Sequence, residues 1–323
     1  MSGVGDVPDA LIGKTGFVGT TLLRQRGFAA GFNRTNIAEA QGQEFGTVIC
    51  AAAPGSMFEA NRFPEADTAA VDALIGHLSR LSARRFVLIS TIAVLADFAG
   101  GDDEGTQAFQ QELAYGRNRR RLEVFCQNQF ETCLILRLPA LFGEGLKKNF
   151  LFDMAHPIPT MLTEARLEQA LGDLSPDLHE GFAALYTLDP ALGLLVVDRA
   201  RADCISTRER IEADLIAAGH SALGFTHPQS RFQYYDMRDL NTDIERAQAA
   251  GLDLLHLAPE PVEAGTVYRH VTGRNMPPNE ARMHREDMRT RHAGLWDRAG
   301  VYSADAAKVL GGVGAFFGQW ARV

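Results

Sequence analysis

ALIGKTGFVG, at residues 10–19, is the stretch that decides the fold. It begins with an apolar run from Ala10 to Ile12 and continues into a loop in which Gly13, Gly16 and Gly19 form the pattern GxxGxxG. Such a loop needs glycines because the backbone turns tightly, a pyrophosphate must approach without meeting a Cβ atom, and the following helix must pack closely on the strand. The pattern therefore predicts a dinucleotide-binding turn between a strand and a helix.

Two other interpretations of glycine-rich segments are excluded. A P-loop would need a glycine five positions before Gly13, where Pro8 stands. GGVGAFFG at 311–318 has similar letters, but too few residues follow it for a βαβ unit, so we expect helix packing or a turn there. Valine in place of Gly13 or Gly16 should abolish dinucleotide binding while the protein remains folded.

Short apolar runs alternate with helical patterns in the first half of the chain, which predicts an α/β fold with a Rossmann-type, doubly wound parallel sheet. Expected strands lie at 10–12, 31–33, 47–52, 86–91 and 133–138, and expected helices at 17–25, 65–82 and 114–129. The alternation breaks down after Gly145 and returns with a strand at 232–235, a helix at 240–250 and a strand at 254–258. We expect an NAD(P)-binding domain over 1–145, with 230–258 returning to its sheet, and a smaller, mostly helical C-terminal substrate lobe over 146–323.

Composition excludes several classes of protein. The net charge of −8 argues against a nucleic-acid partner, because affinity for phosphates comes from clustered Lys and Arg. No apolar stretch approaches the roughly 20 residues of a membrane span, and no targeting signal is recognisable. The cysteines at 50, 126, 133 and 204 lack CxxC spacing, which favours buried thiols in a reducing cytoplasm. The histidines show no tight metal-ligand spacing, so no metal is expected.

The segment GFNRTN at 31–36 bears on the choice of cofactor. A ribose-binding acid near the end of the second strand would indicate NAD, whereas an Arg suits the 2′-phosphate of NADP. Asn33 and Arg34 occupy this place, which favours NADP slightly over NAD; the alternative is that Arg34 is a solvent-exposed loop residue. The predicted cofactor site comprises Gly13, Thr15, Gly16, Phe17, Val18, Gly19, Asn33, Arg34, Ala51 and Ala52.

Four motifs are similar to those of one enzyme family: TGFVG at 15–19, STIAV at 90–94, YGRNR at 115–119 and RLPALFG at 137–143. Together they resemble the extended short-chain dehydrogenase/reductases, the NAD-dependent epimerase/dehydratase family, and FQYYDM at 232–237 and LAPEPV at 257–262 extend the resemblance. It implies a nucleotide-linked sugar as substrate.

The resemblance also implies catalytic residues. Thr91 matches the family's hydroxyl residue and Tyr115 its catalytic Tyr. The family places Lys four residues after the Tyr, where this chain has Arg119, and we expect Arg119 to support proton transfer less well than Lys would.

Further residues follow the strand at 133–138. In the family, polar and basic groups after this strand bind the nucleotide diphosphate, so Lys147 and Asn149 are the predicted substrate-binding residues. The alternative is that Lys147 and its neighbour Lys148 form a solvated face. Arg137 is expected to form a structural ion pair instead.

Two functions remain open from the sequence. The first is an NAD(P)-dependent oxidoreductase or epimerase/dehydratase, in which the cofactor performs the hydride chemistry and the protein positions it. The second is a non-catalytic NAD(P)-binding sensor or scaffold, which Arg119 favours. The oligomeric state is open as well, a homodimer included.

Overall fold

The computed structural model describes residues 7–320, and the chain divides into two compact units. The first unit takes in the chain up to Leu146, the segment 232–262 and the segment from Arg285 onward. The second unit takes in 147–231 and 263–284. The segment from Arg285 onward thus belongs to the first unit, although the sequence analysis assigned it to the C-terminal lobe.

The first unit is built on a sheet of six parallel strands in the order β12-β5-β4-β3-β1-β2. These strands are β1 (Ala10–Ile12), β2 (Ala30–Phe32), β3 (Glu44–Cys50), β4 (Ser82–Thr91), β5 (Cys133–Leu138) and β12 (Leu254–His256). The helices of this unit are α1 (Phe17–Gln25), α2 (Met57–Arg62), α3 (Pro64–Leu78), α4 (Ala114–Gln129), α10 (Leu240–Ala249) and α12 (Ala306–Trp320). The predicted α/β fold with a doubly wound parallel sheet is confirmed.

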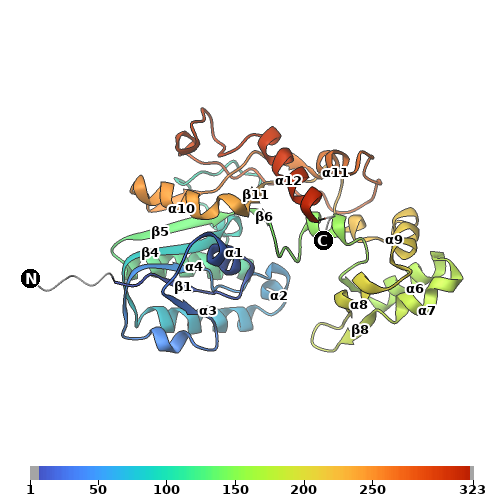
Figure 1. Cartoon of the computed structure of the whole chain (residues 1–323), viewed down its shortest axis with the longest axis horizontal. Helices are drawn as coiled ribbons and strands as arrows, with labels where there is room; N and C mark the ends of the chain where they lie inside the picture. Colours follow the sequence, from blue (N-terminus) through green and yellow to red (C-terminus); the bar gives the residue numbers. More distant parts are fainter. Residues whose placement is uncertain (1–6, 321–323) are drawn as a thin grey trace, which may run out of the picture. The chain divides into compact units, whose positions relative to one another are not determined.

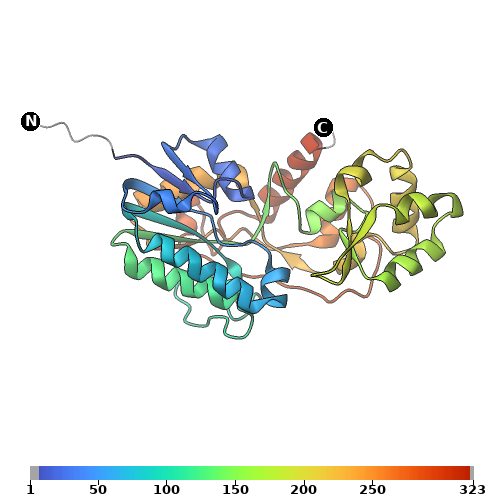
Figure 2. The same cartoon turned by 90° about the horizontal axis from the view of Figure 1, so that it is seen from below.

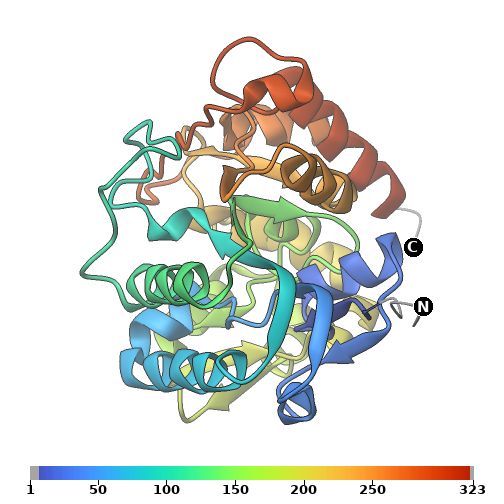
Figure 3. The ribbon, with the colours of Figure 1, turned by 90° about the vertical axis from the view of Figure 1, so that its left-hand side faces the viewer.

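Helices cover both faces of this sheet (Figures 1 and 3). On one face, α3 and α4 bury Val71 and Leu122 in a core with alternate strand residues such as Ile12. On the other face, α1 and α10 pack in a second core that contains Leu11. A strand that is buried on both faces needs apolar side chains at successive positions, which explains the continuous apolar runs of the sequence.

Three of the four cysteines lie in the core beneath α3 and α4, as expected: Cys50, Cys126 and Cys133 are buried and free. Cys204 is exposed, which corrects the expectation that all four thiols are buried. It is the last residue of a short helix at 199–204.

The order of the strands reverses at β1, since β2 lies on one side of β1 and β3 on the other. In open α/β sheets, ligands bind at the carboxyl ends of the strands where such a reversal occurs. The loops that follow these three strands begin at Gly13, Asn33 and Ala51. The glycine loop and the other predicted cofactor residues therefore gather at one edge of the sheet.

The later part of the first unit contributes strands in two different places. β12 lies beside β5 in the main sheet. β11 (Tyr234–Asp236) pairs instead with β6 (Ala140–Phe142) in a separate parallel pair. The GGVGAFFG segment lies inside α12, in agreement with the helix-packing interpretation.

The second unit is mostly helical, with a small antiparallel sheet and its own core. Its elements are α5 (Phe150–Ala155), β7 (Met161–Leu162), α6 (Glu164–Asp173), α7 (His179–Ala183), β8 (Tyr186–Asp189), β9 (Leu194–Val197), α8 (Arg199–Cys204), α9 (Arg208–Ala217) and α11 (Ala264–Thr272). The chain passes between the units at β10 (Arg231–Phe232) and β13 (Val262–Glu263). Among the described residues, no helix combines the length and apolar character that a membrane span requires.

Candidate active site

The three glycines of the loop have three different roles. Gly13 has φ +95°, and a Cβ atom on it would lie 2.4 Å from the carbonyl oxygen of Ala51. A Cβ on Gly19 would lie 2.1 Å from the carbonyl oxygen of Gly13. These two glycines therefore allow the tight turn and the close packing of α1.

Gly16 differs because a Cβ there would meet open space, with only the Gly13 carbonyl oxygen within 4 Å, at 3.6 Å. Gly16 is the N-cap of α1, and no side chain caps this helix end. The first amides of a helix have no intrahelical acceptor, so those of Phe17 and Val18 are available to an anion, and Thr15 is exposed beside them. The helix dipole favours negative charge at the same point.

The residues after β3 form one wall of this site. The amide of Ala51 donates to the carbonyl of Ile12 over 2.8 Å, which fixes the loop against the end of β1. Ala51 and Ala52 are half-buried, and their side chains are small.

The end of β2 holds the residues predicted to select the cofactor. The side-chain oxygen of Asn33 accepts hydrogen bonds from the amide and the hydroxyl of Thr35, so it serves the turn. Arg34 is exposed and forms no ion pair with any described residue. Lys14 lies beside them, because its side chain crosses Gly31 so closely that a Cβ on Gly31 would be 3.0 Å from the Lys14 Cδ. Lys14 was not among the predicted cofactor residues, although its place inside the glycine loop could have indicated it.

The structure brings Thr91 and Tyr115 together. Thr91 ends β4 and caps the short 3-10 helix η2 (Ile92–Val94), and its side chain lies within hydrogen-bonding reach of Tyr115. Gly116 allows this proximity, because a Cβ on it would lie 2.0 Å from the carbonyl oxygen of Ala93 in η2. Asn61 fixes the start of α4 by accepting a hydrogen bond from the Tyr115 amide over 3.0 Å.

Arg119 lies one helical turn beyond Tyr115, but it is not a free cation. Its guanidinium pairs with Asp67 of α3 at 2.5 Å, and both side chains are 3% exposed. The guanidinium also lies over the face of the Tyr115 ring, with its carbon 4.1 Å from the ring centroid. Its other contacts are the carbonyl oxygens of Tyr115 and Pro54. The Nε atom is buried and has no partner among the described residues.

Burial raises the pKa of Tyr115 above its ordinary value, even though the charge of Arg119 and the hydrogen bond from Thr91 both act to lower it. The carboxylate of Asp67 adds to the increase. The phenol is therefore neutral at neutral pH, and in that form it donates a hydrogen bond.

A buried polar network holds α4 against the sheet. Glu123 accepts hydrogen bonds from Ser90 at 2.5 Å and from Arg137 at 2.7 Å, which confirms the structural ion pair expected for Arg137. Arg137 also contacts Nε2 of His256 over 3.1 Å, and Nδ1 of His256 lies 2.8 Å from the carbonyl oxygen of Arg289. Because a carbonyl only accepts, Nδ1 carries the proton and Nε2 accepts from Arg137. Burial lowers the pKa of His256, which keeps the imidazole neutral.

Lys147 and Asn149 belong to the second unit. Lys147 is exposed. Asn149 has φ 114° and caps α5, since its side-chain oxygen accepts from the amides of Leu151 and Phe152. The structure therefore shows a structural role for Asn149, and the sequence analysis did not identify it.

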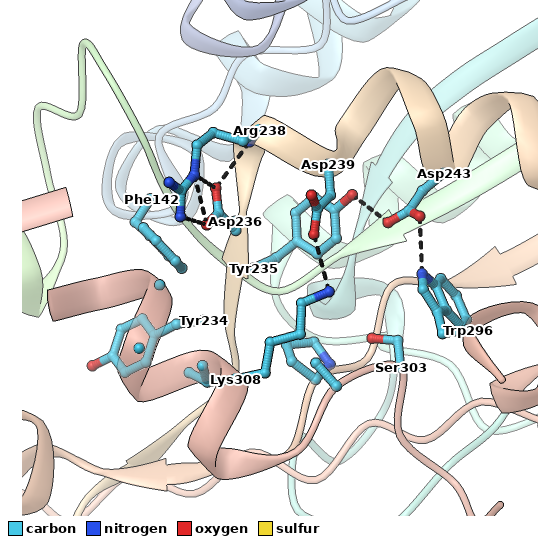
Figure 4. A pocket seen from close by; sticks show the side chains of 15 residues that line it. Phe142, Tyr234, Tyr235, Asp236, Arg238, Asp239, Asp243, Trp296, Ser303 and Lys308 are labelled. Carbon is cyan, nitrogen blue, oxygen red and sulfur yellow. Dashed lines mark hydrogen bonds and ion pairs between the residues drawn. The ribbon is translucent and has the colours of Figure 1, made fainter. Parts of the chain in front are cut away.

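A second feature of the first unit, also missed from the sequence, is a cavity of about 270 Å³ beside the ends of β6 and β11 (Figure 4). Phe142 and Tyr234 contribute aromatic rings to its walls. Its charges are already paired: Lys308 of α12 reaches Asp239 at 3.3 Å, and Arg238 pairs with Asp236 at 2.5 Å. Deeper inside, Asp243 accepts hydrogen bonds from Tyr235 at 2.7 Å and from Trp296 at 2.9 Å.

No protein-family model matches the sequence, and no curated protein matches it either. Solved structures do match over nearly the whole chain. A UDP-galactose 4-epimerase is 13% identical, with a TM-score of 0.59 over 97% of this chain and 98% of its own. RMD from Pseudomonas aeruginosa, solved with NADPH, is 14% identical, with a TM-score of 0.60 over 98% and 100%. MoeE5, solved with UDP-glucose and NAD, is 12% identical, with a TM-score of 0.56 over 97% and 99%. The chain shares the fold of these proteins.

Proposed function

We propose that this chain is an NAD(P)-dependent oxidoreductase or epimerase/dehydratase of the extended short-chain dehydrogenase/reductase kind, acting on a nucleotide-linked sugar or a related small molecule. The observation that carries the proposal is the pairing of Thr91 with Tyr115 at the edge of the sheet where the uncapped end of α1 lies. The solved structures that share this fold support it, because they include a nucleotide-sugar epimerase and complexes with NAD, NADP or NADPH.

The first unit fits a dinucleotide in several respects. The open space at Gly16 and the free amides of Phe17 and Val18 suit a pyrophosphate. Arg34 and Lys14 offer positive charge at the end of β2, which suits the 2′-phosphate of NADP. The unpartnered Nε of Arg119 would be satisfied by a hydroxyl oxygen of a bound molecule.

The chain's own residues would then handle the proton. A bound nicotinamide supplies the hydride chemistry. Tyr115 exchanges a proton with the oxygen of the reacting carbon, and Thr91 donates a hydrogen bond to that oxygen as charge develops on it. We assign Lys147 and Asn149 to binding of the nucleotide part, and the cavity beside Tyr234 offers a second place for a substrate group.

The test begins with calorimetric binding of NAD, NADH, NADP and NADPH to the full chain. Nucleotide sugars are then offered with whichever cofactor binds, across a pH series. We expect binding of at least one dinucleotide, slow turnover with a basic optimum, and loss of most activity in Tyr115→Phe. Wild-type activity in Tyr115→Phe would exclude the assigned proton transfer.

A second function, non-catalytic NAD(P) binding by a sensor or scaffold, is favoured by one specific observation. Arg119 is engaged by Asp67, whose carboxylate opposes the lowering effect of Arg119 on the pKa of Tyr115, and burial raises that pKa overall. Dinucleotide binding without turnover of any substrate, in both the wild type and Arg119→Lys, would establish this alternative.

A further inference from the structure

Asp67 contacts the candidate active site from a neighbouring helix. α3 and α4 run side by side on one face of the sheet (Figure 2). Asp67 of α3 contacts α4 through Asn118 and Arg119. Its carboxylate accepts from Asn118 at 2.7 Å and pairs with Arg119 at 2.5 Å. An aspartate this deeply buried needs a compensating charge, and Arg119 supplies it.

The same pairing determines what Arg119 can do for Tyr115. A cation lowers the pKa of a neighbouring phenol by stabilising the phenolate, typically by about 1 to 3 units. Here the carboxylate of Asp67 opposes that effect, and the guanidinium is held over the face of the ring. A cation over the face of a ring is attracted to the neutral aromatic system as well as to the phenolate.

We propose that Asp67 is a positioning residue for Tyr115: it pairs with Arg119, offsets part of the guanidinium charge that faces the buried phenol, and holds the guanidinium over the ring. The charged groups that face the phenol are Arg119 on α4 and Asp67 on α3, and Thr91 on β4 adds a hydrogen bond. One consequence rests on the proposed function: the pH–rate profile of the enzyme should lie at more basic pH than it would without Asp67.

The ionisation of Tyr115 can be measured without cofactor or substrate. The full chain, which has six tyrosines, is labelled with 3-fluorotyrosine and titrated by fluorine NMR, and Tyr115→Phe identifies the resonance. We expect Asp67→Asn to lower the pKa of Tyr115 by at least about one unit, because Arg119 is then uncompensated. An unchanged or higher pKa in a folded Asp67→Asn protein would overturn the proposal.

Asp72→Asn is a matched control on the same pair of helices. Asp72 pairs with Arg121 at 2.6 Å, as Asp67 pairs with Arg119, but the two side chains are 58% and 43% exposed. Its loss should leave the Tyr115 titration unchanged. An equal shift in both variants would overturn the proposal, since it would show a general effect of charge on these helices.

Asp67→Asn alone leaves the buried charge of Arg119 unpaired and could prevent folding. The double variant Asp67→Asn with Arg119→Gln covers that case, because it removes both charges of the buried pair. Its Tyr115 pKa should stay closer to the wild-type value than that of the single variant. An increase of about one unit or more would show that Arg119 acts as an uncompensated cation in the wild type, and would overturn the proposal.

Turnover provides an independent readout once a substrate is known. The basic limb of the pH–rate profile should move to lower pH in Asp67→Asn by the same amount as the Tyr115 titration, and it should not move in Asp72→Asn. If the Tyr115 pKa shifts in Asp67→Asn but the pH–rate profile does not, Asp67 has no effect on catalysis through Tyr115. If the wild type binds no dinucleotide, the proposed function fails, but the titration still decides the role of Asp67.

Discussion

Gly13 and Gly16 lie three residues apart in one loop, yet the structure predicts opposite consequences for the same substitution. Gly16 has φ −78°, which any residue adopts, and open space where its side chain would be. Gly16→Val should therefore fold normally and lose dinucleotide affinity at least about tenfold, because the new side chain occupies the place of the pyrophosphate. Calorimetry with NADP, together with thermal unfolding, measures both effects.

Gly13→Val should instead be unstable, which corrects the expectation that this variant remains folded. Its φ of +95° disfavours a branched side chain, and the Cβ would collide with the backbone of Ala51. Gly27→Val, in open space at the other end of α1, is the control for an added side chain. Wild-type NADP affinity in a folded Gly16→Val protein would remove the glycine loop from the cofactor site.

The choice between NADP and NAD is predicted to depend on Arg34 and Lys14 together. A charge-assisted hydrogen bond to phosphate contributes roughly 1.5 to 3 kcal/mol. Arg34→Ala and Lys14→Ala should each weaken NADP binding about tenfold or more and leave NAD binding unchanged. Calorimetric titration of both dinucleotides decides this, and equal losses for NAD and NADP would show that neither residue contacts the 2′-phosphate.

Contacts between site residues could be predicted from the sequence only where the residues lie in motifs with a characteristic spacing. The distance from STIAV to YGRNR was enough to suggest that Thr91 and Tyr115 meet. Asp67 lies 52 residues before Arg119, within an ordinary helical pattern, and nothing local distinguishes it from the exposed Asp72. The two aspartates differ because α3 packs on α4 at Asp67 and leaves Asp72 exposed. A contact between two helices cannot be predicted from the sequence of either helix alone.

At the level of elements, prediction succeeded where local signals coincide. α4 and β5 have the expected bounds: the apolar run of β5 is buried throughout, and a proline stops it. α2 was missed, although Ser56 caps it by accepting from the Glu59 amide, in the S-x-x-E pattern of a capping box. With only six residues, α2 carries no helical periodicity of its own.

The contact between α4 and η2 predicts a sensitive position at Gly116. Ala at 116 would place a Cβ 2.0 Å from the Ala93 carbonyl oxygen, so α4 must move away from η2. Gly116→Ala should lower the free energy of unfolding by roughly 1 to 3 kcal/mol and separate Tyr115 from Thr91, with loss of activity. Urea unfolding measures the first effect, and the Tyr115 titration described above reports the second.

Gly76→Ala provides the comparison, because Gly76 lies in α3 with nothing within 4 Å of an added Cβ. Alanine should stabilise that helix by about 0.5 to 1 kcal/mol. If Gly116→Ala proved as stable as Gly76→Ala, the close approach of α4 to η2 would not exist in solution.

At the scale of the whole molecule, the sequence pattern predicted one return of the chain to the first unit, over 230–258, but it did not predict the second return after Arg285. The final return, after Arg285, depends on contacts with residues far away in the sequence. The hydroxyl of Thr290 and the amide of Arg291 both donate to the carboxylate of Glu104, 186 and 187 residues earlier. Polar contacts of this kind leave no periodic pattern in the sequence, because each joins two residues that lie far apart in the chain.

The pH dependence of stability offers a test in the second unit. Burial raises the pKa of Asp153 to about 7, from an ordinary value of 3.8, and Arg199 opposes the shift only in part. Between these two values the folded chain holds a proton that the unfolded chain has released. The contribution of this group therefore makes the protein more stable as pH falls from about 7 toward about 4, and less stable as pH rises.

Asp153→Asn should accordingly be more stable than the wild type at about pH 8, by on the order of 1 to 3 kcal/mol, because the folded state no longer carries a half-buried carboxylate. The advantage should shrink as pH falls through 7, since the wild-type carboxyl is then protonated and equally neutral. Asp177→Asn, at an exposed carboxylate paired with Arg210, is the control and should give no such gain. Scanning calorimetry of the three proteins across this pH range measures the differences. An Asp153→Asn protein that matches the wild type at every pH would show that water reaches Asp153 in solution and that its carboxylate is not buried.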